Sequence, residues 1–270
     1  MTICIAGICD SGRSIVAVSD RKVSKESYSN DMMDIKIRDL TKDWAVMSAS
    51  DKASEIPPII EAVKAELGGG TCSRVRMVEV FTEVLQEHIN TCATNSVLVP
   101  FGISMSDFLK EGWRIFTDQE HEKIVSNISN LRINSDFLVF GFDGDGRSHI
   151  LVISDQKQGG FEINHYDPLA MVGSGYFMAE SILFFHGYRD VGDVYEATYL
   201  LCHAKFMAES AEGVGRPTTV LLKQLGKEPL FLRDEDIEII RDFWESEGKP
   251  RIPESAYAMV RNVIHKAEAR

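Results

Sequence analysis

The chain has 270 residues, of which 44% are apolar, and this length allows a sizeable core in one large domain or two smaller ones. Acidic residues outnumber basic residues by 41 to 29, and the net charge of -12 argues against a general nucleic-acid-binding protein, which needs a clustered basic surface. No secretory signal pattern opens the chain and no stretch is apolar enough to span a bilayer, so we expect a cytoplasmic protein with no membrane partner.

The first fifty residues predict four short strands. Residues 3–8 and 14–19 are rich in β-branched and small apolar side chains and flank a glycine-containing turn, which predicts a hairpin. Residues 22–31 are polar and are expected to form a loop. A third strand is expected around residues 35–38 and a fourth over residues 44–49. Strands this close in sequence favour local, antiparallel pairing.

Two helices are expected next. The first ends at Leu67 and has Asp51 or Ser54 as a candidate capping residue. The second is predicted over residues 73–91, where apolar side chains recur at helical spacing. The stretch that follows is less regular, although a further helix is expected over residues 119–131.

Strand patterns return in the second half of the chain, separated by glycine-rich turns. These strands are expected over residues 137–142, 149–154 and 161–166. After a Gly-Ser-Gly turn, helices are expected over residues 177–186 and 191–210, and a last strand over residues 218–224. Helical spacing reappears over residues 233–247 and 253–269, in a more charged segment.

The order of these elements predicts the fold class. Strands, helices, strands, helices and a last strand indicate an α+β protein, in which two helical layers enclose two packed antiparallel sheets as a four-layer αββα sandwich. We divide the chain into a main domain, residues 1–226, and a C-terminal helical extension, residues 227–270.

The cysteines and histidines give no support for a metal site. Five cysteines are scattered without a CxxC pair, and the seven histidines include no HExxH motif or close pair. We therefore expect neither a disulfide framework nor a metal or other cofactor. Cys4 raises a separate question, because a thiol two residues from Thr2 is itself a potential nucleophile.

Three polar side chains are expected to converge at one end of a sheet. A hairpin brings the strand start at Thr2 alongside the strand end near Asp20, and the third strand would carry Lys36 to the same side. A hydroxyl, a carboxylate and an ammonium group placed together are chemically complementary.

These residues lie in segments that resemble a known family. TICIAGICDSGRSIVAVSDRKVS, followed by KIRDLTKDWAVMSASD, resembles the opening of proteasome β-subunits and their bacterial relatives, and VGSGYFMAESIL resembles the family's later GSG turn and helix. The resemblance covers most of residues 2–225. It implies the N-terminal-nucleophile (Ntn) hydrolase fold and a threonine-type peptidase that forms an acyl-enzyme on Thr2. Such a mechanism uses the free amine of the threonine, so Met1 has to be removed.

The resemblance also implies a role for each site residue. Thr2 is the nucleophile, Lys36 keeps the threonine amine neutral and stabilises a negatively charged oxygen, and Asp20 holds Lys36 in place. Ser174 of the GSG turn orients the amine, and the backbone N–H of Ser50 forms the oxyanion hole.

Family members also carry an acid near the end of the last long helix, which completes the hydrogen bonds of the amine. Here Glu209 and Glu212 are both candidates for that acid. Two alternatives stay open, a non-catalytic ring subunit and an Ntn amidase for small molecules, although the joint presence of Thr2, Asp20 and Lys36 argues against the first. The resemblance implies peptide or unfolded-protein substrates, self-assembly into a ring or another homo-oligomer, and a potential unfoldase partner.

Overall fold

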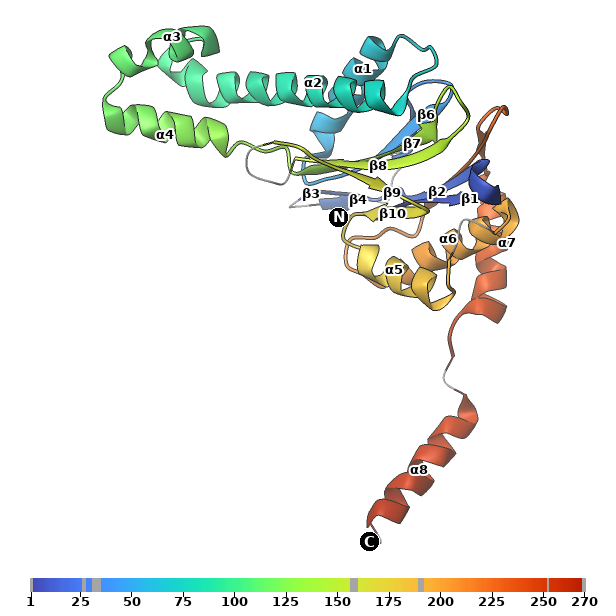
Figure 1. The fold of residues 1–270 in the computed structure, drawn as a ribbon. Coiled ribbons are helices and arrows are strands. Elements are labelled where there is room, and N and C mark those ends of the chain that lie inside the picture. Colours follow the sequence, from blue (N-terminus) through green and yellow to red (C-terminus); the bar gives the residue numbers. More distant parts are fainter. Residues whose placement is uncertain are drawn as a thin grey trace.

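The computed structural model describes residues 2–25, 28–30, 35–155, 160–188, 192–251 and 253–268. It is a four-layer sandwich, in which helices α1 and α2 cover one sheet and helices α5, α6 and α7 cover the other (Figure 1). The strands are β1 (Cys4–Cys9), β2 (Ser14–Asp20), β3 (Val23–Lys25), β4 (Tyr28–Asn30), β5 (Arg38–Asp39), β6 (Trp44–Ser50), β7 (Ser135–Phe142), β8 (Ser148–Ser154), β9 (Glu162–Tyr166), β10 (Leu169–Val172), β11 (Thr218–Gln224) and β12 (Leu230–Phe231). The α-helices are α1 (Ile56–Leu67), α2 (Arg74–Ala93), α3 (Met105–Ile115), α4 (Asp118–Ser129), α5 (Tyr176–Phe185), α6 (Val194–Ala208), α7 (Asp234–Phe243) and α8 (Glu254–Glu268). Shorter helical segments are η1 (Asp10–Gly12), η2 (Ala53–Glu55), η3 (Thr94–Leu98), η4 (Val99–Phe101) and η5 (Trp244–Gly248).

Both large sheets are five-stranded and antiparallel. The first sheet has the strand order β10-β1-β2-β11-β12, and the second has the order β5-β6-β7-β8-β9. Some neighbouring strands are close in sequence, as in β1–β2, β5–β6 and β7–β8–β9. Others are distant in sequence: β10 pairs with β1, β7 pairs with β6, and β11 returns from the C-terminal half to pair with β2 over residues 218–224. That long-range pairing brings the segment after α6 next to the end of β2.

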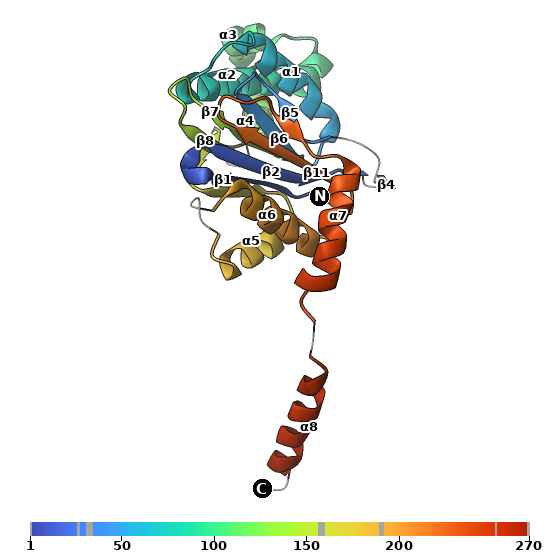
Figure 2. The same cartoon turned by 90° about the vertical axis from the view of Figure 1, so that its right-hand side faces the viewer.

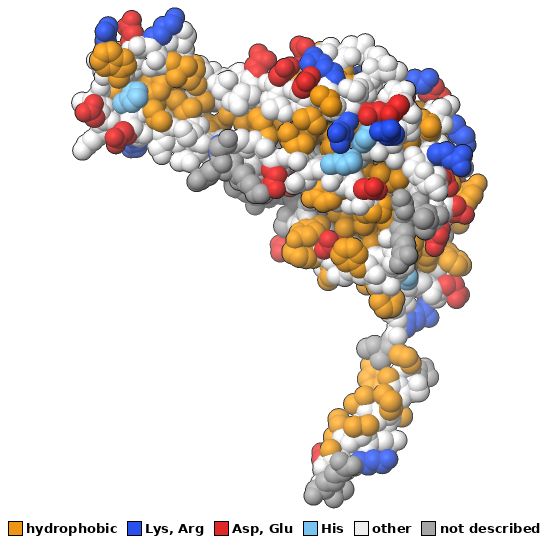
Figure 3. All heavy atoms as spheres, viewed as in Figure 1, with side chains coloured by type: hydrophobic (Ala, Val, Ile, Leu, Met, Phe, Trp, Pro, Cys, Tyr) orange, Lys and Arg blue, Asp and Glu red, His pale blue; other side chains and the backbone are white. Residues whose placement is uncertain are grey.

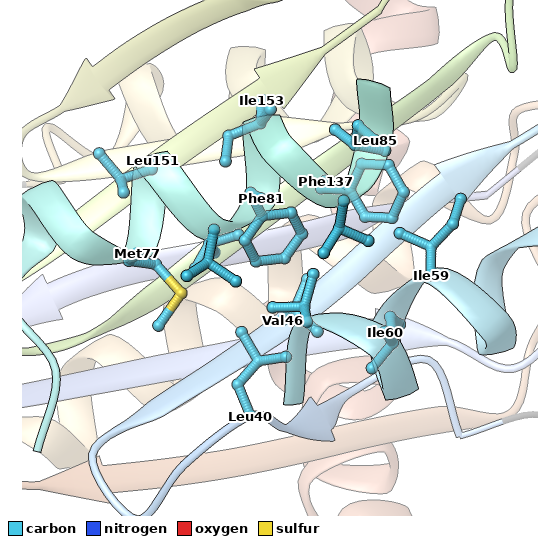
Figure 4. Packing of buried hydrophobic residues seen from close by; sticks show 14 of the residues in the cluster. Leu40, Val46, Ile59, Ile60, Met77, Phe81, Leu85, Phe137, Leu151 and Ile153 are labelled. Atoms are coloured by element: carbon cyan, nitrogen blue, oxygen red, sulfur yellow. The ribbon is translucent and has the colours of Figure 1, made fainter. Parts of the chain in front are cut away.

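Three layers of apolar side chains hold the sandwich together. Between α1–α2 and the second sheet, Phe81 packs against Phe137 with ring centroids 5.7 Å apart (Figure 4). Cys4 points into the core between the sheets, whereas its neighbour Ile3 packs toward α5 and α6. This alternation follows from the two-residue period of a strand and makes the first sheet apolar on both faces. The predicted αββα architecture is confirmed.

Several local predictions need correction. Residues 22–31 were expected to form a loop, but β3 and β4 form a separate two-stranded ribbon there, although residues 26, 27 and 31 lie outside the described part. Lys36 lies just before β5 rather than on a strand. Helix α1 begins after η2 with Glu55 at its N-cap position, and neither of the predicted caps bonds it through its side chain. Strands β10 and β12 and helix α3 were not predicted.

The C-terminal segment divides into a packed part and a separate part. Strand β12 pairs with β11, and Ile237 and Trp244 lie in the core formed with α6, so this part belongs to the sandwich although it follows residue 226. Helix α8 lies apart from the four layers, at the end of the connecting segment (Figure 2). Within the described residues, no helix combines the length and the apolar character needed to cross a bilayer.

Candidate active site

Strand pairing positions the first two site residues. Cys4 lies opposite Ser19, and the N–H of Asp20 donates to the carbonyl of Ile3 at 3.2 Å, so Thr2 and Asp20 lie at the same end of the first sheet. The Thr2 hydroxyl donates a hydrogen bond to Asp20 Oδ1. Thr2 itself is only 5% exposed. The removal of Met1 stays a prediction, because Met1 lies outside the described residues.

The Asp20 carboxylate is fully buried and surrounded by donors. Oδ1 accepts from the N–H of Ile3 at 3.0 Å, and Oδ2 accepts from the N–H groups of Lys22 and Gly215, each at 3.1 Å. A buried carboxylate without such partners would be strongly disfavoured in its charged form. These backbone donors therefore stabilise Asp20 as an anion at a defined position.

Lys36 completes the group. Its ammonium nitrogen lies 2.7 Å from Asp20 Oδ1 and donates a hydrogen bond to the Thr2 hydroxyl. Its side chain is 10% exposed. The next residue, Ile37, is buried between the two sheets and fixes the backbone from which Lys36 projects. The structure therefore brings Thr2, Asp20 and Lys36 together, whereas their catalytic roles stay predictions.

Of these three residues, Thr2 lines a cavity of about 640 Å³. Thr2 lies in its wall with Ser50 and with Gly173 and Ser174 of the GSG turn. Gly173 has a φ of 101°, and a Cβ there would collide with the Thr2 carbonyl, so only glycine fits this close approach. The N–H of Gly175 donates to the same carbonyl at 3.2 Å. The turn thus fixes the backbone of Thr2, and the exposed side chain of Ser174 faces the same cavity.

The backbone of β6 sets the direction of the Ser50 N–H, the predicted oxyanion donor. Asp51 donates its N–H to Asn134 on the β7 side, while the carbonyl of Trp44 accepts from Leu40 on the β5 side. Successive residues of a strand point their N–H groups in opposite directions. The Ser50 N–H therefore points away from β7, toward the side of the sheet where Lys36 precedes β5. The Ser50 hydroxyl has other partners, accepting from Ser135 Oγ at 2.8 Å and from the N–H of Lys52 at 2.9 Å.

Cys4 is a poor alternative nucleophile. It is fully buried beside the trio, and burial, opposed by the charge of Lys36, raises the pKa of its thiol to about 12. A protonated thiol is a weak nucleophile, because the thiolate is the reactive form. Cys4 therefore acts as a small apolar side chain between the sheets.

The two candidate acids lie in different environments. Glu209 binds Arg241 through both carboxylate oxygens, at 2.7 and 2.9 Å, and its Oε1 lies 2.6 Å from the ammonium group of Lys205. Glu212 is exposed. The carboxylate of Glu209 is thus engaged in a buried ionic cluster, and the assignment of an amine-holding acid to either residue stays a prediction.

Sequence reasoning missed Lys205 and Arg241. The ammonium group of Lys205 donates to the carbonyls of Gly215 and Arg216 at 2.8 and 2.7 Å, and Arg241 also donates to the Arg216 carbonyl. Because the N–H of Gly215 donates to Asp20, this cluster holds the backbone segment that contacts Asp20. The spacing of Lys205 and Glu209, four apart on one helix, was a detectable signal. Arg241 had no comparable signal in the sequence.

The fold and this site together define a class, a four-layer αββα sandwich with a threonine just before its first strand. No family model matches the chain, and no curated protein matches its sequence. Among solved structures, the fold is similar to that of Anbu (ancestral beta-subunit) from Yersinia bercovieri, with a TM-score of 0.63. The two share 13% sequence identity, and the match covers 94% of this chain and 100% of that chain. At this identity the likeness shows a proteasome-like fold and does not establish an activity.

Proposed function

We propose that this chain is a threonine-type Ntn hydrolase that cleaves peptide bonds through an acyl-enzyme on Thr2. The observation that carries the proposal is the contact of one hydroxyl with both a buried carboxylate and an ammonium group, in the wall of a cavity. A threonine hydroxyl needs a neighbouring base to become a nucleophile. Removal of Met1 would supply that base as the free amine of Thr2.

The proposed reaction begins with attack of Thr2 Oγ1 on the substrate carbonyl carbon. The hydroxyl proton passes to the neutral Thr2 amine, directly or through a water, and then to the leaving amine of the substrate. Lys36 disfavours a positive charge on the Thr2 amine by repulsion, while Asp20 keeps Lys36 in position. The N–H of Ser50 stabilises the negative oxygen of the intermediate. Water then hydrolyses the ester on Thr2 and regenerates the hydroxyl.

The cavity supports a substrate larger than a simple amide. Its volume lies within the range of about 300–1,000 Å³ usual for sites that enclose organic ligands. Polar residues Asp51 and Asp136 line it together with the apolar side chains of Val152 and Val172. This mixture suits a peptide, which presents backbone polar groups and side chains together.

We also propose self-assembly into a ring or another homo-oligomer. The support is apolar surface that the described contacts of a single chain leave uncovered, on the arm formed by α3 and α4 and along α8 (Figure 3). Leu109 and Trp113 of α3 are 74% and 61% exposed. Contiguous exposed apolar surface marks sites of protein contact. Native mass spectrometry of the full chain would show the number of subunits, and a purely monomeric protein would contradict this part.

The catalytic proposal is tested with a threonine-directed peptide epoxyketone. Intact mass should show that Met1 is absent from active protein and that wild type gains one inhibitor per chain. Thr2→Ala should gain none and lose at least about 10³-fold in peptide hydrolysis, because it lacks the nucleophile. Thr2→Ser keeps a hydroxyl and should retain measurable labelling. Active protein that retains Met1 would contradict the mechanism.

Other outcomes of this test favour the alternatives. Hydrolysis of simple amides without hydrolysis of peptides would favour a small-molecule amidase. Complete absence of labelling and hydrolysis in protein shown to lack Met1 would favour a non-catalytic subunit.

A further inference from the structure

Three potential metal ligands meet on the helical layer that covers the second sheet. Glu55 ends η2, while His88 and Cys92 lie four residues apart on α2, so the two α2 side chains share one helix face. One ligand atom from each lies within 4.8 Å of the others. The sequence pattern did not indicate this group, because Glu55 is distant in sequence from His88 and Cys92 and neither a CxxC nor an HExxH motif is present.

The two separations that involve His88 are close to those of a tetrahedral zinc site. His88 Nε2 lies 3.6 Å from Glu55 Oε2 and 3.6 Å from Cys92 Sγ. With ordinary zinc bonds to sulfur, nitrogen and oxygen, tetrahedral geometry places neighbouring ligand atoms about 3.3–3.6 Å apart. An ion therefore fits among these atoms with small adjustments of the side chains.

We propose that Glu55, His88 and Cys92 bind a zinc-class divalent cation, with water in the fourth position. Thiolate and imidazole ligands favour Zn²⁺ over Mg²⁺ or Ca²⁺, which prefer oxygen. On binding, the Cys92 thiol loses its proton to solvent, and imidazole Nε2 and carboxylate Oε2 bind through lone pairs. The three side chains are half-buried, which leaves an entry path for the ion.

The surroundings of Glu55 orient its carboxylate for this role. The ammonium group of Lys52 lies 3.2 Å from Glu55 Oε1, which leaves Oε2 directed toward His88. Metal-bound carboxylates are commonly held through their other oxygen in this way. The positive charge of Lys52 opposes a cation at the same time, but this lysine is 54% exposed and well solvated.

This site is separate from the proposed catalytic centre. None of its three ligands lines the cavity beside Thr2. The metal proposal therefore does not depend on hydrolase activity, and Thr2→Ala should bind metal as wild type does.

The test uses the full chain without an affinity tag, titrated with Co²⁺ under reducing conditions. Wild type should develop a near-ultraviolet sulfur-to-cobalt absorption band at one ion per chain, and Zn²⁺ should abolish it by displacement. Cys92→Ser should lose the band. His88→Gln and Glu55→Gln should weaken binding at least about tenfold. Cys72→Ser and His121→Gln, which change a cysteine and a histidine outside the group, should bind like wild type.

Several results would overturn the proposal. The first is a wild-type titration without the band, which requires no variant. A band that persists in Cys92→Ser or disappears in Cys72→Ser would place the metal elsewhere. Circular dichroism and thermal melts in chelator should show that each variant is folded. Zn²⁺ should then raise the melting temperature of wild type and leave that of Cys92→Ser unchanged.

Discussion

Two buried ionic clusters lie on either side of Gly215. The open cluster consists of Thr2, Asp20 and Lys36 beside the cavity, and the closed cluster consists of Lys205, Glu209 and Arg241 under α7. Gly215 joins them, since its N–H donates to Asp20 while its carbonyl accepts from Lys205.

The clusters use similar charges in different settings. In the closed cluster Lys205 and Arg241 are 0% and 1% exposed and contact carboxylates and backbone carbonyls. Arg241 also contacts the Thr218 hydroxyl and the ring of Phe206. In the open cluster the charges meet a hydroxyl that lines a cavity. Burial and ion pairing alone therefore do not indicate a catalytic site. The distinguishing feature of the open cluster is the contact of one hydroxyl, the proposed nucleophile, with both a carboxylate and an ammonium group.

The largest expected effect on activity comes from the open cluster. Lys36→Met removes the charge while keeping most of the side-chain length, and it should lower peptide hydrolysis by about 10²–10⁴-fold, because the amine and the oxyanion lose their charged neighbour. Steady-state kinetics on a peptide substrate measure the loss. Lys42→Met, an exposed lysine in the turn before β6, serves as the matched control. Unchanged kcat/KM in Lys36→Met would remove this cluster from the mechanism.

The largest expected effect on stability comes from the closed cluster. Glu209→Gln leaves the buried charge of Lys205 without its carboxylate partner. Among the described carboxylates it leaves Arg241 with only Glu238, 3.6 Å from its Nε. Removing one partner of a buried pair typically costs about 3–5 kcal/mol. Denaturant unfolding measures this change. Glu212→Gln alters an exposed acid on the same segment and should change stability by less than about 0.5 kcal/mol.

This pair of variants also bears on the amine-holding acid. Loss of activity in Glu212→Gln at unchanged stability would assign that role to Glu212. If Glu209→Gln were as stable as wild type, the closed cluster would not be a structural element.

A smaller effect is expected from the titration of Lys205. Burial, opposed by Glu209, lowers its pKa from the usual 10.5 to about 8. Between these two values the unfolded chain binds the proton more tightly, so the free energy of unfolding should rise with pH over that window. Below about pH 8 both states are protonated and this contribution is constant. Comparing the unfolding free energies of wild type and Lys205→Met at several pH values isolates the contribution of Lys205. If this contribution fell as the pH rose over the window, the pKa of Lys205 would be raised in the folded protein, not lowered.

The smallest expected effect concerns a cysteine beside each cluster. Burial raises the pKa values of Cys4 and Cys202 to about 12, even though cationic side chains lie near both. Both thiols should therefore resist iodoacetamide in native, metal-free protein, while the half-buried Cys92 reacts first. Peptide mass spectrometry after timed labelling reports the order. Rapid labelling of Cys4 would mean that the open cluster activates a thiol as well as a hydroxyl.

The sequence was most informative where one segment carries a complete pattern. Helix α2 was predicted over residues 73–91 and occupies Arg74–Ala93, because its apolar face repeats over five turns. Strand β12 has two residues and no period, so its existence depends on β11. The ribbon of β3 and β4 was not predicted, because the polar composition of this segment is typical of a loop. Turn propensity and pairing compete in such short segments.

In the candidate site, too, local contacts were predicted and contacts between distant segments were not. The juxtaposition of Thr2 and Asp20 followed from a hairpin, which is a local feature. Lys36 was expected on a strand next to the hairpin, but it comes from the segment before β5, a strand of the other sheet. Similarly, Glu209 was expected near the amine but lies in an ionic cluster with Arg241, which is 32 residues away in the chain.

The sequence by itself therefore determined most of the longer helices and strands, the layered fold class and the placement of Thr2 beside Asp20 at one end of the first sheet, because periodicity and hairpin pairing act over short distances along the chain. Only the tertiary structure decided how β11 closes the sheet, which donors surround Asp20, how Lys205 and Arg241 support Gly215, and that Glu55 meets His88 and Cys92. Those contacts join segments whose separation in sequence carries no periodic signal, and the packing of the layers brings them together.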